Sequence, residues 1–253
     1  MTDSVPSWEP EGPLVSSIPA TAPSTEKTLV GRYVDLVPLR ESHAEELYHD
    51  LGGAEKGQLY KYLYGGPYAD IESFTAFIKS VCDAPCVPYA IRSKSPSTHA
   101  APGSSEERAG SLVGMIMYLN IVPSHRSVEV GLVLFGARLA RTTAATETCY
   151  LMMKHAFEDL NFLRVEWKAN VLNEPSKRAA LRLGFVYEGL FRKHMVVKGR
   201  GRDSAYFSVI DEEWEGGVRE ALERWLRDDN FDSQGRQKFR LEEIREGIID
   251  QKK

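Results

Sequence analysis

A strand, a short basic loop and a helix follow one another in the middle of the chain, and this unit constrains the fold more than any other stretch. An apolar run covers residues 128–135, and apolar residues recur at helical spacing over 149–160. The loop between them, 138–147, leaves backbone N–H groups free at a helix N-terminus, where the helix dipole favours an anion. We therefore interpret it as a phosphate-binding loop, the alternative being an ordinary capped helix start. The residues assigned to it are Arg138, Arg141, Thr142, Thr143 and Ala144.

A second motif opens another predicted helix. Asn173 is suited to cap this helix, because its side chain can accept a hydrogen bond from the first turn, and Pro175 fits that turn. Gly184 is expected to end the helix. Asn173 and Ser176 act either as caps alone or as caps that also bind a ligand.

Alternating and helical patterns predict the remaining elements. Strands are expected over 32–39, 87–91, 112–122, 127–135, 164–171 and 185–188. A hairpin is expected over 191–210, with its turn at 198–203. Helices are expected over 42–51, capped by Ser42, and over 71–82 and 173–183.

These motifs together resemble the GNAT superfamily of acetyl-CoA-dependent N-acetyltransferases. The resemblance rests on the strand 129–135, the basic loop, an Asn-x-x-Ser motif at 173–176 and a Gly-Phe-x-x-Glu-Gly motif at 184–189. Within the superfamily the chain is most similar to the branch that contains the ribosomal-protein N-terminal acetyltransferases. The resemblance implies an α/β (α+β) fold, with a mostly antiparallel twisted sheet flanked by helices and splayed central strands that hold CoA.

Three regions are expected along the chain, of which the resemblance covers only the middle one. Residues 29–214 form the GNAT domain, which a polar insertion at 94–109, expected to be mobile, interrupts. Residues 1–28 are rich in proline, serine and threonine, and a disordered tail is expected there. Residues 215–253 are expected to form a helical appendage.

The implied cofactor site follows the strand and the loop. The backbone around Val133 and Phe135 would pair with pantetheine, and an N–H there would polarise the thioester carbonyl. The loop would bind the pyrophosphate, with Arg141 and Thr143 standing where the family usually has glycine. Asn173 would hold the pantetheine amides. Acetyl-CoA is therefore the expected cosubstrate, and no metal is expected.

The implied chemistry is direct attack of a primary amine on the thioester. The amine must lose a proton first, because alkylammonium groups have pKa values near 10. Glu129 is the candidate base, with Glu166 and Glu188 as weaker candidates; a strand carboxylate paired with a surface base is the alternative for Glu129. Ser176 is the candidate that assists the leaving thiolate, because Ala180 stands where many members carry a tyrosine.

The acceptor is the least readable part of the sequence. The aromatic loop 60–68 is expected near a concave surface, the alternative being tyrosines that pack under the loop. The basic residues over 192–202 are interpreted as a solvated turn, the alternative being a basic patch that meets an acidic acceptor. The acceptor can be a small-molecule amine or a peptide N-terminus. A CoA-binding sensor module that has lost catalysis is the alternative function.

Composition limits the partners. The net charge of −4 over 253 residues argues against a nucleic-acid binder, and no apolar run approaches the roughly 18 residues of a membrane span. The three cysteines match no zinc or redox spacing and are expected to be reduced. A cytoplasmic monomer or homodimer with no membrane partner is expected.

Overall fold

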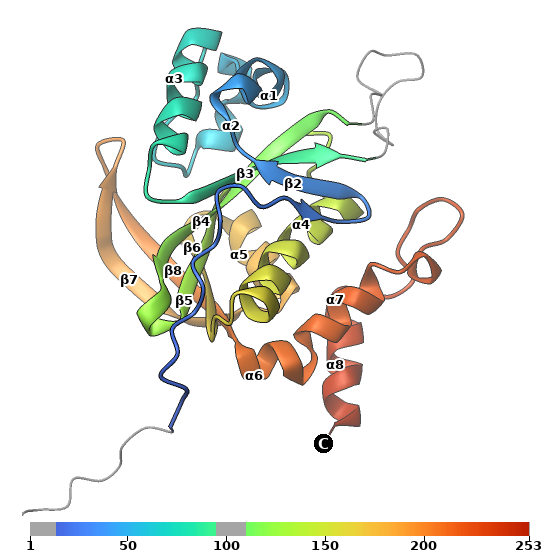
Figure 1. Ribbon diagram of the computed structural model, residues 1–253. Coiled ribbons are helices and arrows are strands. Elements are labelled where there is room, and N and C mark those ends of the chain that lie inside the picture. Colours follow the sequence, from blue (N-terminus) through green and yellow to red (C-terminus); the bar gives the residue numbers. More distant parts are fainter. Residues whose placement is uncertain (1–13, 95–109, 253) are drawn as a thin grey trace, which may run out of the picture.

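The computed structural model describes residues 14–94 and 110–252 (Figure 1). The expectations for residues 1–13 and for the insertion at 95–109 lie outside the described residues. The strands are β1 Leu29–Val30, β2 Val34–Pro38, β3 Val87–Ser93, β4 Leu112–Val122, β5 Ser127–Phe135, β6 Arg164–Asn170, β7 Val186–Val197 and β8 Arg200–Ile210. The helices are α1 Ala44–Leu51, α2 Gly57–Tyr60, α3 Ile71–Cys82, α4 Thr143–Lys154, α5 Glu174–Leu183, α6 Asp211–Glu213, α7 Arg219–Trp225 and α8 Leu241–Gln251.

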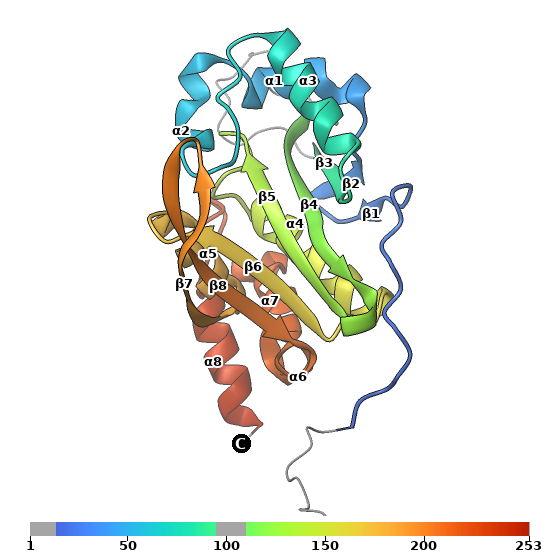
Figure 2. The ribbon, with the colours of Figure 1, turned by 90° about the vertical axis from the view of Figure 1, so that its left-hand side faces the viewer.

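One twisted sheet organises the described chain, with strand order β1-β2-β3-β4-β5-β6-β8-β7. Every neighbouring pair is antiparallel except β5 and β6. That parallel pair joins through only three residue pairs, from Ser127↔Arg164 to Glu129↔Glu166. Beyond Glu129 the two strands diverge, as Figure 2 shows. The expected mostly antiparallel sheet with splayed central strands is therefore confirmed.

Two apolar cores bury the two faces of the first half of the sheet. Alternate residues of β3 point to opposite faces: Tyr89 and Ile91 belong to the core shared with α4, α5, α7 and α8, and Ala90 belongs to the core shared with α1 and α3. Because both faces are covered, β4 is buried without interruption from Leu112 to Tyr118. This arrangement explains why β4 reads as a continuous apolar run.

Local capping follows the sequence in some places and departs from it in others. Asn173 caps α5 as predicted, and Gly184 ends that helix in the left-handed conformation, with φ of 107°. The prediction that Ser42 caps α1 is wrong, because Ser42 lies inside a 3-10 turn that precedes the helix.

The turn of the β7–β8 hairpin is tighter than predicted. It consists of Lys198 and Gly199, both with positive φ, as a two-residue hairpin loop requires.

Both terminal segments pack on the domain. The N–H of Ala20 donates to the Pro123 carbonyl (3.0 Å), and that of Thr21 donates to the Leu160 carbonyl (2.8 Å). The expected tail is therefore held against the domain at residues 20 and 21. Residues 215–252 also pack on the domain, because Leu222, Trp225, Leu241 and Ile248 are buried in the core that α4 and α5 share.

Candidate active site

A long groove crosses the molecule where β5 and β6 separate. Its volume of about 2150 Å³ exceeds the roughly 300–1,000 Å³ of a pocket for one small ligand. One end is lined by residues 58–65, the middle by β5 and β6, and the other end by α4, α5 and residues of the segment 225–242. A groove of this size can hold two reactants that meet in the middle.

A bulge in β5 shapes the middle of the groove. Met117 pairs with Gly131 and Met115 with Leu134, so β5 carries one residue more than β4 over this step. Leu132 lies at the bulge with φ of 43°. Val133 and Phe135 line the groove, as the sequence analysis expects, while their side chains pack against the core. What these two residues can offer a ligand is therefore backbone.

The loop before α4 presents free backbone donors. Oγ1 of Thr142 accepts from the Ala145 N–H (3.2 Å) and donates to the Leu139 carbonyl (2.7 Å). The N–H groups of Thr143 and Ala144 have no hydrogen-bond partner among the described residues, and both residues line the groove. The two interpretations of the loop therefore combine: Thr142 caps the helix and leaves donors that fit an anion.

Arg138 forms an ion pair that its expected role does not include. Its guanidinium forms a two-point contact with the Asp50 carboxylate, with Nε 3.1 Å from Oδ1 and Nη2 2.6 Å from Oδ2. Nη1 also donates to Ser111 Oγ (2.9 Å). The side chains of Arg138 and Asp50 are 15% and 8% exposed. This ion pair ties the loop to α1, so the guanidinium already has a partner within the fold. Arg138 also lines the groove, and its contact with phosphate stays a prediction.

Ser176 is oriented by two neighbours. Its N–H donates to Asn173 Oδ1 (3.2 Å), and its Oγ accepts from Trp167 Nε1 (3.0 Å). Because Oγ accepts from the indole, the hydroxyl proton remains available as a donor. Ser176 and Asn173 line the groove at the start of α5. The sequence patterns did not single out Trp167. Its residue type, a large aromatic with a polar N–H, and its place on the strand before the Asn-x-x-Ser motif are the signals that could have indicated it.

Glu129 is buried beside the point where β5 and β6 diverge. Its carboxylate accepts from Asn120 Nδ2 (2.6 Å) and lies 2.9 Å from Lys168 Nζ. Burial alone would lower the pKa of Lys168, but its bonds to Glu129 and Glu166 outweigh burial and raise that pKa. Lys168 is therefore protonated and pairs with Glu129. Both side chains line the groove.

The two weaker candidates for the base are occupied elsewhere. A hydrogen bond from Arg164 lowers the pKa of Glu188. Burial would raise the pKa of Glu166, but hydrogen bonds from Arg164 and Lys168 outweigh burial and lower it. Neither carboxylate is among the groove-lining residues of the described chain.

The far end of the groove is formed by the aromatic loop and the β7–β8 hairpin. Tyr60 is buried and donates to the Leu51 carbonyl (2.8 Å), so it packs under the loop. Tyr64 is 59% exposed, and the Arg202 guanidinium lies 5.3 Å from its ring centre. Lys198 Nζ donates to the Tyr60 carbonyl (2.7 Å) and joins hairpin to loop. The interpretation of the hairpin cations as a solvated turn is wrong for Arg202, which is only 6% exposed.

A family model described as "Acetyltransferase (GNAT) domain" matches residues 34–186, well over half of the chain. The chain belongs to the GNAT acetyltransferase family. The solved structure of a GCN5-related N-acetyltransferase from Brucella melitensis is 35% identical, with a TM-score of 0.82 over 90% of this chain and 98% of that one.

The chain is also similar to a curated relative and to a second solved structure. YdaF of Bacillus subtilis (strain 168), whose name marks it as a proposed ribosomal N-acetyltransferase, is 36% identical over 107 residues. That match covers 42% of this chain and 58% of YdaF, so the chain spans little more than half of this relative. RimJ of Mycobacterium smegmatis, solved in complex with CoA-disulfide, shares the fold, with a TM-score of 0.60 at 19% identity over 76% of this chain and 88% of that one.

In the loop before α4, one position has a backbone conformation that favours glycine although it carries another residue. Arg141 has φ of 65°, in the left-handed region that favours glycine. Thr143 is the first residue of α4 and needs no such freedom. The departure from the family pattern therefore strains one position only.

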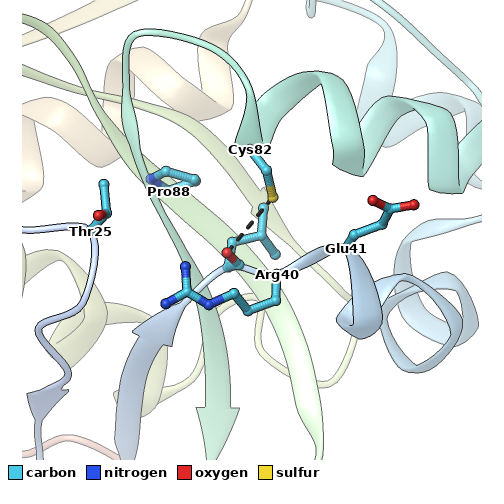
Figure 3. Close-up of a pocket in the computed structure, with 6 residues that line it drawn as sticks. Thr25, Arg40, Glu41, Cys82 and Pro88 are labelled. Atoms are coloured by element: carbon cyan, nitrogen blue, oxygen red, sulfur yellow. Dashed lines mark hydrogen bonds between the residues drawn. The ribbon is translucent and has the colours of Figure 1, made fainter.

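A second cavity lies outside the GNAT groove. It has a volume of about 110 Å³ beside Cys82 and is lined by Thr25, Arg40, Glu41 and Pro88 among others (Figure 3). It can hold a few water molecules at about 30 Å³ each, which is too little for a nucleotide cofactor. Burial raises the pKa of the Cys82 thiol, which donates to the Leu39 carbonyl (3.7 Å). Both the raised pKa and this contact favour the protonated thiol.

The described residues also bear on metals and membranes. They include no group of three or more His, Cys, Asp or Glu side chains arranged to bind a metal ion. No helix among them combines the length and apolar character needed to cross a bilayer. All three cysteines are unpaired thiols.

Proposed function

We propose that this protein transfers an acetyl group from acetyl-CoA to a primary amine of a small molecule or of a peptide N-terminus. One observation carries the proposal. The strands β5 and β6 diverge in the middle of the groove; Glu129 lines it from β5, and Ser176 lines it from the start of α5, where it is bonded to Trp167 of β6. A base and a hydroxyl donor thus border the place where the two reactants would meet.

The residues present fit CoA at the α4 end of the groove. The N–H groups of Thr143 and Ala144, together with the Arg141 cation, suit a pyrophosphate at a helix N-terminus. The side-chain N–H₂ of Asn173 is left to bind an amide carbonyl, because its Oδ1 is used by the helix cap. Bound acetyl-CoA supplies the acetyl group as an activated thioester.

Glu129 would accept the proton that the amine must lose. An ammonium group has no lone pair, so a base must remove its proton before attack, directly or through a water molecule. The contacts with Lys168 and Asn120 hold the carboxylate in place beside the groove. A carboxylate oriented in this way can act as a base when it faces the amine.

Ser176 would donate its hydroxyl proton toward the sulfur as the thiolate leaves. Thiols have a pKa of about 8.5, so the leaving group needs only modest help near neutral pH. Trp167 fixes the oxygen, and the hydroxyl hydrogen is then free to turn toward the groove. The helix cap at Asn173 keeps the first turn of α5 beside the divergent strands.

The test is a panel of amines and peptides incubated with acetyl-CoA. Mass spectrometry detects the acetylated amine, and a thiol reagent measures the CoA released. A gain of one acetyl group with an equal amount of free thiol is the expected result. Acetyl-CoA that raises the melting temperature without any transfer would favour the sensor module, and no stabilisation by millimolar acetyl-CoA would exclude both functions.

A further inference from the structure

Arg202 is a buried cation that the fold leaves without a carboxylate. It lies on β8, is 6% exposed and lines the groove at the end formed by the aromatic loop. Its Nε donates to Ser204 Oγ (3.1 Å), and Tyr64 covers the guanidinium plane. Among the described residues, no Asp or Glu lies within ion-pair distance of it. Four of the five guanidinium N–H groups thus have no protein acceptor there.

The charged side chains of β5, β6 and β7 that lie next to one another on this face of the sheet form ion pairs. Lys168 contacts both Glu129 and Glu166, and Arg164 contacts both Glu166 and Glu188. Buried arginine is normally paired, because removing its charge from water costs several kcal/mol unless a partner offsets it. Arg202 therefore adds one uncompensated positive charge to the acceptor end of the groove.

A chain of hydrogen bonds orients the guanidinium. Ser204 Oγ, which accepts from Arg202, is also bonded to His194 Nδ1 (3.0 Å). His194 Nε2 is bonded in turn to the Tyr206 hydroxyl (3.1 Å). With Nε fixed from behind and one plane covered by Tyr64, the edge that carries the two terminal nitrogens is the part left to meet a ligand.

We propose that Arg202 binds a carboxylate of the acceptor, so that the acceptor is an amine that also carries a carboxylate group. The planar guanidinium matches the two oxygens of a carboxylate. The acceptor would then be an amino acid or a peptide with an acidic group near its N-terminus. The inference rests on the proposed acetyl transfer, whose base Glu129 lies in the same groove, but it predicts a binding preference that exists without turnover.

The test measures binding in the presence of saturating free CoA, which prevents acetyl transfer. Calorimetry compares amino acids and acidic dipeptides with their amides, in matched pairs of different amine-to-carboxylate spacing. The carboxylate member of at least one pair should bind roughly tenfold tighter or more, the range of hydrogen bonds to a charged group. If an amino acid binds tighter than its amide, the acceptor is a free amino acid; if only an acidic dipeptide does so, the acceptor is a peptide. Equal binding in every pair would overturn the proposal.

Two variants and one control identify the residue. Arg202→Gln should abolish the preference, and Arg202→Lys should keep part of it. Arg200→Gln removes a charge from the same hairpin at an exposed position outside the groove, and it should leave the preference unchanged. A preference that survives in Arg202→Gln, or that falls equally in Arg200→Gln, would contradict the role of Arg202.

Thermal unfolding separates a binding role from a structural one. A buried cation without a partner destabilises the fold, so Arg202→Gln should keep or raise the melting temperature of the ligand-free protein. Loss of both stability and preference in Arg202→Gln, with no recovery in Arg202→Lys, would overturn the proposal. Acetylation of amines without any preference for carboxylates would overturn the role of Arg202 and leave acetyl transfer standing. A preference for carboxylates without any acetylation would support the role of Arg202 and overturn acetyl transfer.

Discussion

Two arginines that line the groove, the half-buried Arg138 and the buried Arg202, are held in opposite ways. Arg138 precedes α4 and is neutralised by Asp50 through a two-point contact. Arg202 lies on β8, and among the described residues its guanidinium contacts a serine hydroxyl and a tyrosine ring but no carboxylate. Arg138 occupies a position that the family motif assigns to the cofactor, and Arg202 belongs to a hairpin that looks solvated in sequence. The presence or absence of a carboxylate partner, rather than motif position or burial, therefore indicates which arginine is available to a ligand.

The largest effect is expected at the paired arginine. Asp50→Asn leaves Arg138 buried without a countercharge, which should lower the free energy of unfolding by about 3–5 kcal/mol. For a chain of this length the melting temperature should fall by roughly 10 °C, measured by circular dichroism. Glu41→Gln is the control, because Glu41 and Lys79 form an exposed pair worth less than about 1 kcal/mol. A loss as small as the control would mean that the Arg138 guanidinium does not depend on Asp50.

The pairing of Arg138 shows why this part of the site could not be predicted. Asp50 is 88 residues earlier in the chain, and only the folded sheet brings the two side chains together. In contrast, β4, β5 and α3 have the predicted bounds, because period-2 and period-3.6 patterns are local. The cap at Asn173 could be predicted for the same reason. Trp167 and Arg202 could not, because their roles depend on which residues the splay and the hairpin bring beside them.

The next largest effect tests Glu129, the proposed base in the middle of the groove. Glu129→Gln should lower kcat/KM by roughly 100- to 1,000-fold, the range of general base catalysis, and should make the rate depend more steeply on pH. The reason is that only the small fraction of amine already neutral could then react. The pH profile of initial rates measures this. Glu166→Gln is a matched control, since Glu166 contacts the same Lys168 but does not line the groove. An unchanged pH profile in Glu129→Gln would exclude Glu129 as the base.

A smaller effect is expected at the hydroxyl donor. Ser176→Ala should lower kcat by roughly 10- to 100-fold with little change in the KM for acetyl-CoA, because a proton donor to the leaving thiolate acts only during reaction. Steady-state kinetics separate the two constants. Trp167→Phe, which removes the bond that fixes Oγ, should give a smaller loss of the same kind. A rise in KM alone would instead assign Ser176 to binding.

Arg164 provides a paired counterpart to Arg202 on the same face of the sheet, and its effect should depend on pH. A hydrogen bond from Arg164 lowers the pKa of Glu188. Burial would raise the pKa of Glu166, but Arg164 and Lys168 together lower it. A carboxyl whose folded-state pKa is depressed adds stability above its unfolded pKa of about 4.3, and this stability is lost as the pH falls through the folded-state pKa.

Arg164→Gln should therefore cost about 1 kcal/mol at pH 7, a modest value because Glu188 is 39% exposed. The difference in melting temperature from the unmodified protein should narrow as the pH falls below about 4. Thermal scans from pH 7 to pH 3 measure it. A difference that stays constant with pH would mean that Arg164 stabilises the sheet by packing alone.

The smallest effect is expected at Arg141, where the loop adopts glycine geometry. Replacing Arg141 by Gly removes the strain of a positive φ, and the unfolding free energy should rise by about 0.5–1 kcal/mol. The same change removes a cation from the anion-binding loop, so the Kd for acetyl-CoA should rise a few-fold at low salt and less at high salt. Arg141→Asn separates the two causes, because asparagine tolerates the left-handed region and carries no charge. If Arg141→Asn binds acetyl-CoA as well as the unmodified protein does, the loop before α4 binds the cofactor through its backbone N–H groups and not through the Arg141 charge. Between Arg141 and Arg202, Arg202 would then be the one whose charge recognises a substrate.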